Sequence, residues 1–146
     1  MPQNSYLQVS IISPGGKVYE TTEAKVVTAP SAAGEVSILP KHAPLFTKLN
    51  PGEITVKEEK DAHIFAVFGG SMDVNPDSQV TVLADFAQRS EKIDVDTAQK
   101  AKAEAERLMQ HKEKYSKDEF ARIELTLKQA LFAIKIAEKS KRKKTI

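Results

Sequence analysis

The sequence predicts an α+β protein in which an N-terminal antiparallel β-sandwich is followed by a C-terminal antiparallel two-helix hairpin. Short β-branched runs separated by turn residues fill the first half, which is typical of a sandwich or barrel. Glycine and proline then disappear from Ala87 to Ile146, where alanine, lysine and glutamate dominate, as in helices. Residues 1–88 carry 6 basic and 10 acidic side chains, whereas residues 89–146 carry 16 and 10. We therefore expect two domains, 1–88 and 89–146, with different surroundings.

Six apolar runs are expected to form strands of the sandwich. Alternation supports this, because Leu7, Val9 and Ile11 point one way while the polar residues between them point the other. The runs cover residues 7–12, 25–29, 36–39, 54–56, 64–68 and 80–84, and turn residues separate them at 14–16, 30–34, 51–52, 69–70 and 75–78.

Two helices are expected in the second half, at about 95–113 and about 117–140. The break is marked by Ser116-Lys117-Asp118-Glu119, the pattern of a capping box, with Tyr115 and Phe120 at the positions of a hydrophobic staple. Antiparallel packing of the two helices makes an αα-hairpin.

The helix faces suggest how the hairpin packs. The first helix has a stripe of mainly small residues, Ala98, Ala101, Ala105 and Leu108, and the second has a larger apolar stripe, Phe120, Ile123, Leu127, Leu131 and Ile134. Leu125, Phe132 and Ile136 lie off that stripe, so the second helix has more apolar surface than one alanine-lined partner covers. So small a hairpin has little core of its own, which favours an element that can be docked or released.

Composition and spacing argue against an independent active site. With no cysteine, the chain has no disulfide, thiolate metal site or thiol nucleophile. The three histidines, at 42, 63 and 111, lack metal-ligand spacing, and the glycine pairs at 15–16 and 69–70 lack a phosphate-loop pattern. We therefore name no catalytic residue, metal site or cofactor. Since no run reaches the roughly 20 apolar residues of a membrane span, and the start does not resemble a signal peptide, we expect a soluble protein facing the cytosol.

Two segments resemble a known family. Gly34-Glu35-Val36-Ser37-Ile38-Leu39-Pro40-Lys41-His42-Ala43-Pro44-Leu45 is similar to the G-x-x-x-I-L-P-x-H-A-P-L signature of the epsilon subunit of F-type ATP synthases. Ala66-Val67-Phe68-Gly69-Gly70-Ser71-Met72-Asp73-Val74 resembles that family's A-V-x-G-G-x-x-E-V segment, with Asp73 in place of its glutamate. The resemblance covers essentially the whole chain, since the order of sandwich and hairpin is also the family's.

This resemblance implies a non-catalytic subunit of the central stalk that couples ion flow to ATP synthesis, beside the gamma subunit and on the ring of c subunits. Pro40 and Pro44 predict a stiff, extended loop that presents Lys41 and His42 at one end of the sandwich. By motif position, the resemblance implies that Glu35 and His42 face the ring. The alternative for His42 is a hydrogen bond within its own loop.

The second helix ends in the basic run Lys139-Ser140-Lys141-Arg142-Lys143-Lys144. It is open to three interpretations: a solvated helix end favoured by the helix dipole, a site for an acidic protein, or a nucleic-acid site. No aromatic residue is interleaved with the run, so we expect no nucleic acid partner. The resemblance instead implies that the helix enters the catalytic head, meets an acidic loop of the beta subunits and inhibits ATP hydrolysis. Candidate contacts are Arg122, Lys128, Lys135, Lys141 and Arg142, each of which could instead be a solvated charge.

Some bacterial members of the family bind ATP in the hairpin through an I-D-x-x-R-A motif. Here Ile93, Asp94 and Ala98 match the motif, but Thr97 stands at the arginine position. Arg122 is kept on the second helix, whereas Gln129 and Glu104 stand where basic residues would be expected to help bind a triphosphate. Asp94 could instead be a plain helix N-cap. The alternative functions are therefore an ATP-sensing hairpin and a basic-tail nucleic-acid binder.

The resemblance also implies a location. It places the protein on the cytoplasmic face of a bacterial inner membrane, where it contacts the membrane only through the complex. An organelle-encoded source is the alternative, and the lack of a transit-peptide pattern argues against import of a nuclear-encoded chain.

Overall fold

The computed structural model describes residues 5–144, with side chains described as far as Lys139. The chain divides into two compact units, Met1–Arg89 and Ser90–Ile146. The first is a β-sandwich and the second contains two long helices, so the predicted fold class is confirmed.

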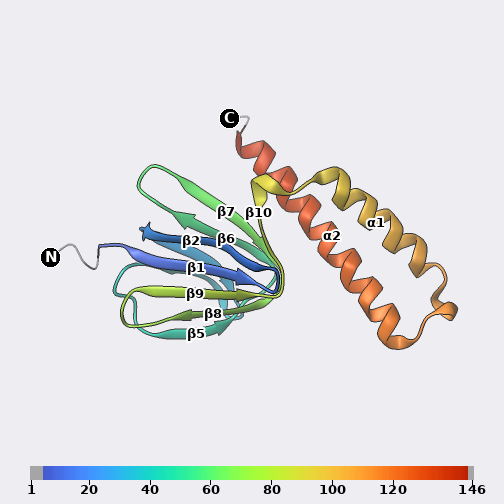
Figure 1. The fold of residues 1–146 in the computed structure, drawn as a ribbon, viewed down its shortest axis with the longest axis horizontal. Coiled ribbons are helices and arrows are strands. Elements are labelled where there is room, and N and C mark those ends of the chain that lie inside the picture. Colours follow the sequence, from blue (N-terminus) through green and yellow to red (C-terminus); the bar gives the residue numbers. More distant parts are fainter. Residues whose placement is uncertain (1–4, 145–146) are drawn as a thin grey trace. The chain divides into compact units, whose positions relative to one another are not determined.

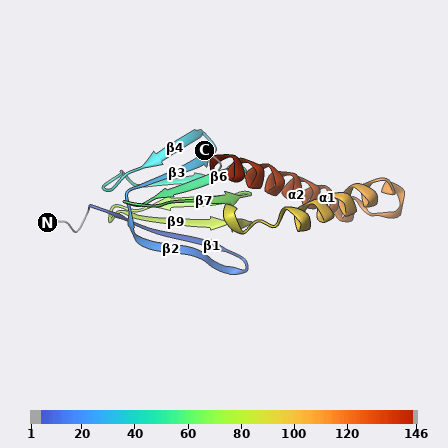
Figure 2. The ribbon, with the colours of Figure 1, turned by 90° about the horizontal axis from the view of Figure 1, so that it is seen from above.

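The first unit consists of two five-stranded sheets, which Figure 2 shows as separate layers. In order across the first sheet the strands are β2 (Gly16–Ala24), β1 (Leu7–Ser13), β9 (Gln79–Ala84), β8 (Gly70–Val74) and β5 (Leu45–Lys48). In the second sheet they are β10 (Ala87–Arg89), β7 (Ala62–Val67), β6 (Gly52–Lys57), β3 (Val26–Ser31) and β4 (Gly34–Ile38). Their path through the sandwich can be followed in Figure 1.

The core lies between the two sheets and follows the alternation of the sequence. Leu7, Val9 and Ile11 are fully buried, whereas Gln8 between them is exposed, as predicted for β1. Phe65 on β7 and Met72 on β8 are among the largest fully buried side chains. Burial of such side chains between two sheets is the main source of sandwich stability.

Four of the ten strands lie outside the six predicted apolar runs: β2, β5, β8 and β10. They are polar, as in β2, or short, so they lack the continuous apolar run that was used as the signal. The sheets are antiparallel except that β1 and β9, which are adjacent in the first sheet, run parallel. Alternation within single strands does not reveal this, because it is the same for both pairings.

The segment between β4 and β5 is not the uniformly extended loop that its prolines predict. A turn forms at its start, where the His42 N–H donates to the carbonyl oxygen of Leu39 at 3.1 Å. Lys41 has a φ of 69°, in the left-handed region, and its N–H donates to Ser78 Oγ at 2.8 Å. This bond to another loop stabilises a conformation that the sequence of the segment alone does not indicate.

The second unit contains η2 (Ser90–Lys92), α1 (Val95–Met109), η3 (Lys112–Lys114) and α2 (Lys117–Lys144). The predicted capping box is confirmed: the Ser116 N–H donates to Glu119 Oε1 at 3.2 Å, and the Glu119 N–H donates to Ser116 Oγ at 3.1 Å. The first helix ends four residues earlier than predicted, because the chain continues through a 3₁₀ turn. The second extends four residues further, into the basic run.

The helices of the hairpin lie side by side (Figure 1), with alanine buried on both of them. Ala98 and Ala105 on α1 are buried, as are Ala130 and Ala133 on α2. The placement of Leu131 in the interface was wrong, since its side chain is 44% exposed. The buried face of α2 runs through Ala130 and Ala133, on either side of Leu131 in the sequence, and this leaves Leu131 on the exposed side.

Candidate interaction sites

An exposed face of α2 combines leucine with lysine. Leu125, Lys128, Leu131 and Lys135 follow one another at steps of three, three and four residues, which places them along one side of the helix. All four are exposed, and the two leucines keep 46% and 44% of their surface accessible. We call these four residues the Leu/Lys face. Within unit 2 it offers a partner both apolar area and positive charge.

The other basic candidates extend this pattern. Arg122 is exposed three residues before Leu125, and its carbonyl oxygen accepts a bond from Thr126 Oγ1 at 3.0 Å. Lys141 and Arg142 belong to the last turns of α2, but their side chains lie outside the described part of the chain.

The predicted ring-facing residues lie along β4, which is the edge strand of its sheet. Glu35 is exposed near the start of β4, whereas Lys41 and His42 follow its end, so about 13 Å of strand separates the two groups. His42 Nδ1 lies 2.6 Å from the carbonyl oxygen of Ala43, which is the contact within its own loop that the sequence left as an alternative. The structure thus arranges the three residues along an edge and not in one cluster.

An apolar patch on the first sheet was missed by the sequence analysis. Phe46 on β5 is 69% exposed and Leu83 on β9 is 53% exposed. Leu83 faces away from the core, since the flanking Val82 and Ala84 are buried, and Phe46 lies on the same face because it is in register, through Asp73, with Thr81. The sequence feature that could have indicated Phe46 and Leu83 is a large apolar residue at a position where the alternation of the strand predicts an outward side chain. Asp73 and Ser71 of β8 lie between them, so this sheet face offers a partner two separate apolar side chains among polar residues.

The candidate ATP-binding residues are not brought together. Asp94 is the N-cap of α1, where its carboxylate accepts bonds from the N–H of Asp96 at 3.0 Å and the hydroxyl of Thr97 at 2.9 Å. Arg122 is at the other end of the hairpin, next to Ile123, which lines a groove with Ala105. The helical rise between residues 94 and 105 of about 16 Å separates Asp94 from the level of α1 at which Ile123 and Arg122 lie. Ile93 and Ala98 therefore flank a helix cap at the end of the hairpin that is remote from Arg122.

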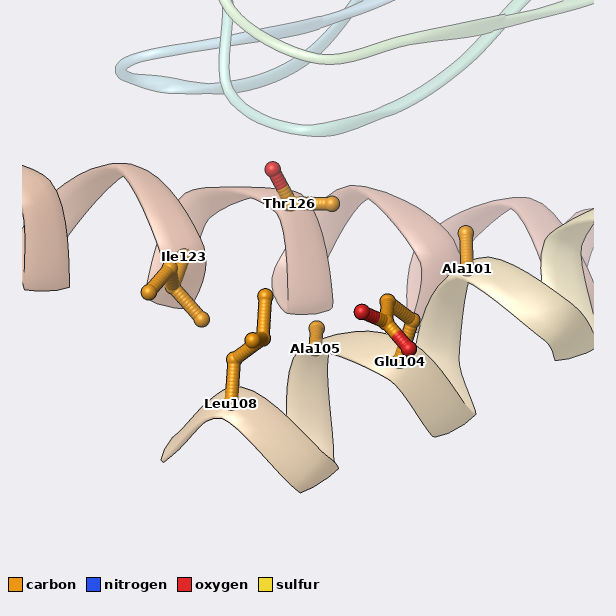
Figure 3. Close-up of a pocket in the computed structure, with 6 residues that line it drawn as sticks. All are labelled: Ala101, Glu104, Ala105, Leu108, Ile123 and Thr126. Carbon is orange, nitrogen blue, oxygen red and sulfur yellow. The ribbon is translucent and has the colours of Figure 1, made fainter. Parts of the chain in front are cut away.

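The groove between α1 and α2 has a volume of about 250 Å³ and is mainly apolar. In Figure 3 Leu108 and Ile123 point toward each other from the two helices, and Glu104 is the ionisable residue among those that line it. Glu104 is paired with Arg107, whose Nη2 lies 2.6 Å from Oε1, and this bond lowers the pKa of the Glu104 carboxyl. A groove lined by a carboxylate does not suit a triphosphate.

Two capping carboxylates make the hairpin sensitive to acid. Bonds from Thr97 lower the pKa of Asp94, and bonds from Ser116 lower the pKa of Glu119. A lowered folded-state pKa gives stability that is present above the unfolded values, about 3.9 and 4.3, and is lost as the pH falls through the folded-state pKa. We expect the helical circular dichroism signal to fall below about pH 4 and the double variant Asp94→Asn/Glu119→Gln to flatten that dependence. Identical pH profiles would contradict this role.

A cluster of polar and aromatic side chains closes one side of the sandwich. Tyr19 on β2 donates its hydroxyl to Glu58 Oε1, and His63 Nε2 lies 3.0 Å from the same oxygen. Burial and the bond to Glu58 raise the pKa of Tyr19 to about 12, so its hydroxyl stays protonated at neutral pH. The guanidinium of Arg89 lies over the ring of Tyr19, 5.2 Å from its centroid. His63 is the second residue of β7 and belongs to this cluster.

The described residues also constrain the kind of protein. They contain no group of three or more histidine, cysteine, aspartate or glutamate side chains arranged to hold a metal ion. Among the helices of residues 5–144, none is long and apolar enough to cross a membrane. What the structure presents are surfaces: a sheet face with two exposed apolar side chains, a charged strand edge and a helix face that combines leucine with lysine. They define a sandwich-and-hairpin protein of the kind that assembles with other proteins.

Comparison with known families identifies which one. A family model described as "ATP synthase, Delta/Epsilon chain, beta-sandwich domain" matches residues 6–90, and one described as "ATP synthase, Delta/Epsilon chain, long alpha-helix domain" matches residues 91–138. The chain belongs to the ATP synthase delta/epsilon chain family, which confirms the resemblance of its two motifs.

Relatives named ATP synthase epsilon chain match over nearly their whole length. The protein of Exiguobacterium sp. is 40% identical over 133 residues, which is 90% of this chain and 96% of the relative. That of Alkalilimnicola ehrlichii is 36% identical over 140 residues, covering 95% and 97%. A chain in the cryo-EM structure of the Euglena gracilis mitochondrial ATP synthase OSCP/F1/c-ring has a TM-score of 0.68, with 21% identity and coverage of 92% and 81%. That likeness supports the fold.

Proposed function

We propose that this chain is the epsilon subunit of the central stalk, with the sandwich as its anchor and the hairpin as a brake on ATP hydrolysis. It has no chemistry of its own and acts by linking other subunits. The observation that carries the braking role is the Leu/Lys face, because exposed leucines between lysines on a long helix suit an apolar and acidic partner surface. The partner is the alpha/beta catalytic head.

The anchor has two surfaces in this proposal. Phe46 and Leu83 give the first sheet an apolar patch for the gamma subunit, since desolvated aromatic and leucine side chains form the centre of stable interfaces. The β4 edge carries Glu35 at one end and Lys41 and His42 at the other, and it faces the ring of c subunits. A partner must therefore extend along the strand to meet all three residues.

The brake requires the hairpin to leave its docked position and extend into the head. Its face combines two kinds of interaction: apolar burial of Leu125 and Leu131, and charge pairing by Lys128 and Lys135. Lys141 and Arg142 add positive charge further along the sequence. Long-range attraction would guide the helix to an acidic surface, and burial of the leucines would hold it there.

The proposed location is supported by bacterial relatives that are named ATP synthase epsilon chain. We place the subunit on the cytoplasmic face of the inner membrane, held there through the complex. An ATP-sensing role has less support, because the Asp94 carboxylate is used as a helix cap and Arg122 lies at the other end of the hairpin.

The anchor is tested by charging the apolar patch. We expect Phe46→Asp/Leu83→Asp to weaken binding to the epsilon-free head complex of three alpha, three beta and one gamma subunit by about tenfold, because both carboxylates would need to be desolvated. Binding is measured by fluorescence titration with labelled protein. Ser37→Asp, on the exposed side of the opposite sheet, is the control and should bind normally in this complex, which lacks the ring. Equal binding of the double variant and the control would exclude the patch as the anchor.

A further inference from the structure

The boundary between the two units falls at a single peptide bond, between Arg89 and Ser90. The strand before it, β10, has three residues and pairs with β7 only, since it is the edge strand of its sheet. Such a short edge strand has few bonds to keep it in the sheet. If β10 stays in its sheet, the flexible connection between the two units begins after Arg89. If β10 detaches, the connection begins earlier in the chain.

Arg89 holds the end of β10 by contacts outside the strand ladder. Its guanidinium lies 5.2 Å from the centroid of the Tyr19 ring and 5.5 Å from that of the Phe65 ring. The two rings are themselves in contact, with centroids 5.0 Å apart. Tyr19 lies on β2, in the other sheet, so Arg89 joins the edges of both sheets at the root of the hairpin. A cation over aromatic faces is attractive, and more so when partly shielded from water.

The side chain of Tyr19, over which Arg89 lies, is held in place as well. Glu58 accepts the Tyr19 hydroxyl bond, and His63 pairs with the same carboxylate while its ring contacts that of Tyr19 at 5.1 Å. Before β10, the Phe68 N–H donates to the carbonyl oxygen of Phe86 at 3.0 Å. The strand is thus fixed at its start by a backbone bond and at its end by Arg89.

We propose that Arg89 is a latch that keeps β10 in the sandwich, so that the hairpin pivots at the junction of Arg89 and Ser90 and not further back at Phe86. The inference rests on the proposed movement of the hairpin. Release of the latch would add residues 87–89 to the flexible connection and extend the reach of the hairpin by about 10 Å. The latch would therefore set how far into the head the Leu/Lys face can extend.

Amide hydrogen exchange in the isolated full-length protein tests the latch. The result does not depend on whether the hairpin moves relative to the sandwich. We expect Arg89→Gln and Tyr19→Leu each to speed exchange at residues 87–89 by about fivefold or more, while β6 and the rest of β7 keep their rates. Arg89→Lys, which keeps a cation, should restore part of the protection. Unchanged exchange rates in β10 would overturn the latch. Equal acceleration of exchange in every strand would also overturn it, because that result shows only a loss of overall stability.

Distances between the units test the pivot. The natural chain has no cysteine, so Ala33→Cys and Glu113→Cys give one labelled pair at exposed positions for electron-resonance distance measurements in the head complex. We expect Arg89→Gln to broaden the distribution by up to about 10 Å. Faster β10 exchange with an unchanged distribution would overturn the pivot. If the wild-type pair gave the same narrow distance distribution in the free protein and in the complex, the proposed movement of the hairpin would be contradicted. The hydrogen exchange result would then test the latch by itself.

Discussion

Gly70→Ala is expected to destabilise the sandwich by about 4 kcal/mol or more, which is a large part of the roughly 5–15 kcal/mol by which an ordinary domain is stable. A Cβ at Gly70 would lie 2.2 Å from the carbonyl oxygen of Leu83 and 2.7 Å from Cα of Ala84. These are backbone atoms of the paired strand β9, so they can move away only by breaking the register between β8 and β9. The glycine has a φ of +120°, which adds backbone strain for any other residue.

Gly16→Ala separates these two effects. Gly16 has nearly the same φ, +123°, but nothing lies within 4 Å of its added Cβ. It should therefore cost only the backbone strain, about 1–3 kcal/mol. Urea unfolding followed by fluorescence or circular dichroism measures both variants. If Gly70→Ala and Gly16→Ala lowered the free energy of unfolding equally, the close approach of β9 would not explain why position 70 needs a glycine.

Lys128→Glu/Lys135→Glu is expected to abolish inhibition of ATP hydrolysis, raising the concentration needed for half-inhibition by about 100-fold. Each substitution replaces an attraction to an acidic surface by a repulsion, and such pairs cost several kcal/mol where water is excluded. Both residues are exposed, so the exchange leaves the buried alanines between α1 and α2 in place. Hydrolysis by the epsilon-free head complex is measured at increasing concentrations of each protein.

The matched control is Lys100→Glu/Lys114→Glu, which makes the same change in charge at exposed positions of the hairpin outside α2. It should inhibit like the wild type at moderate salt. Equal loss of inhibition in both double variants would mean that overall charge, and not the Leu/Lys face, controls the effect. Equal helical circular dichroism in the two would show that neither change has unfolded the hairpin.

The fold could be predicted where one pattern decides it. Alternation placed Leu7, Val9 and Ile11 in the core, and the capping box placed the start of α2. The parallel pairing of β1 with β9 could not be predicted, because it joins segments about 70 residues apart and leaves alternation unchanged. The outward position of Leu131 depends on how closely two helices approach, which the periodicity of one helix does not define.

The candidate sites could be predicted less completely. The motif around His42 and the predicted strand between Glu35 and His42 indicated an interaction edge, but only coordinates show the left-handed turn at Lys41 and its bond to Ser78. Phe46 and Leu83 share one sheet face only because β5 and β9 lie on either side of β8. The contact of Arg89 with Tyr19 joins residues from the two ends of the sandwich sequence, and no local pattern marks it.

ATP hydrolysis by the epsilon-free head complex, measured with the full chain and with a version ending at Arg89, tests the central claim most directly. The shorter version contains all ten strands of the sandwich and no part of the hairpin. We predict that both bind the complex and that only the full chain slows hydrolysis, since the anchor and the brake are separate units. Binding of both without inhibition would contradict the brake, and binding of neither would contradict the assignment of the sandwich as the anchor.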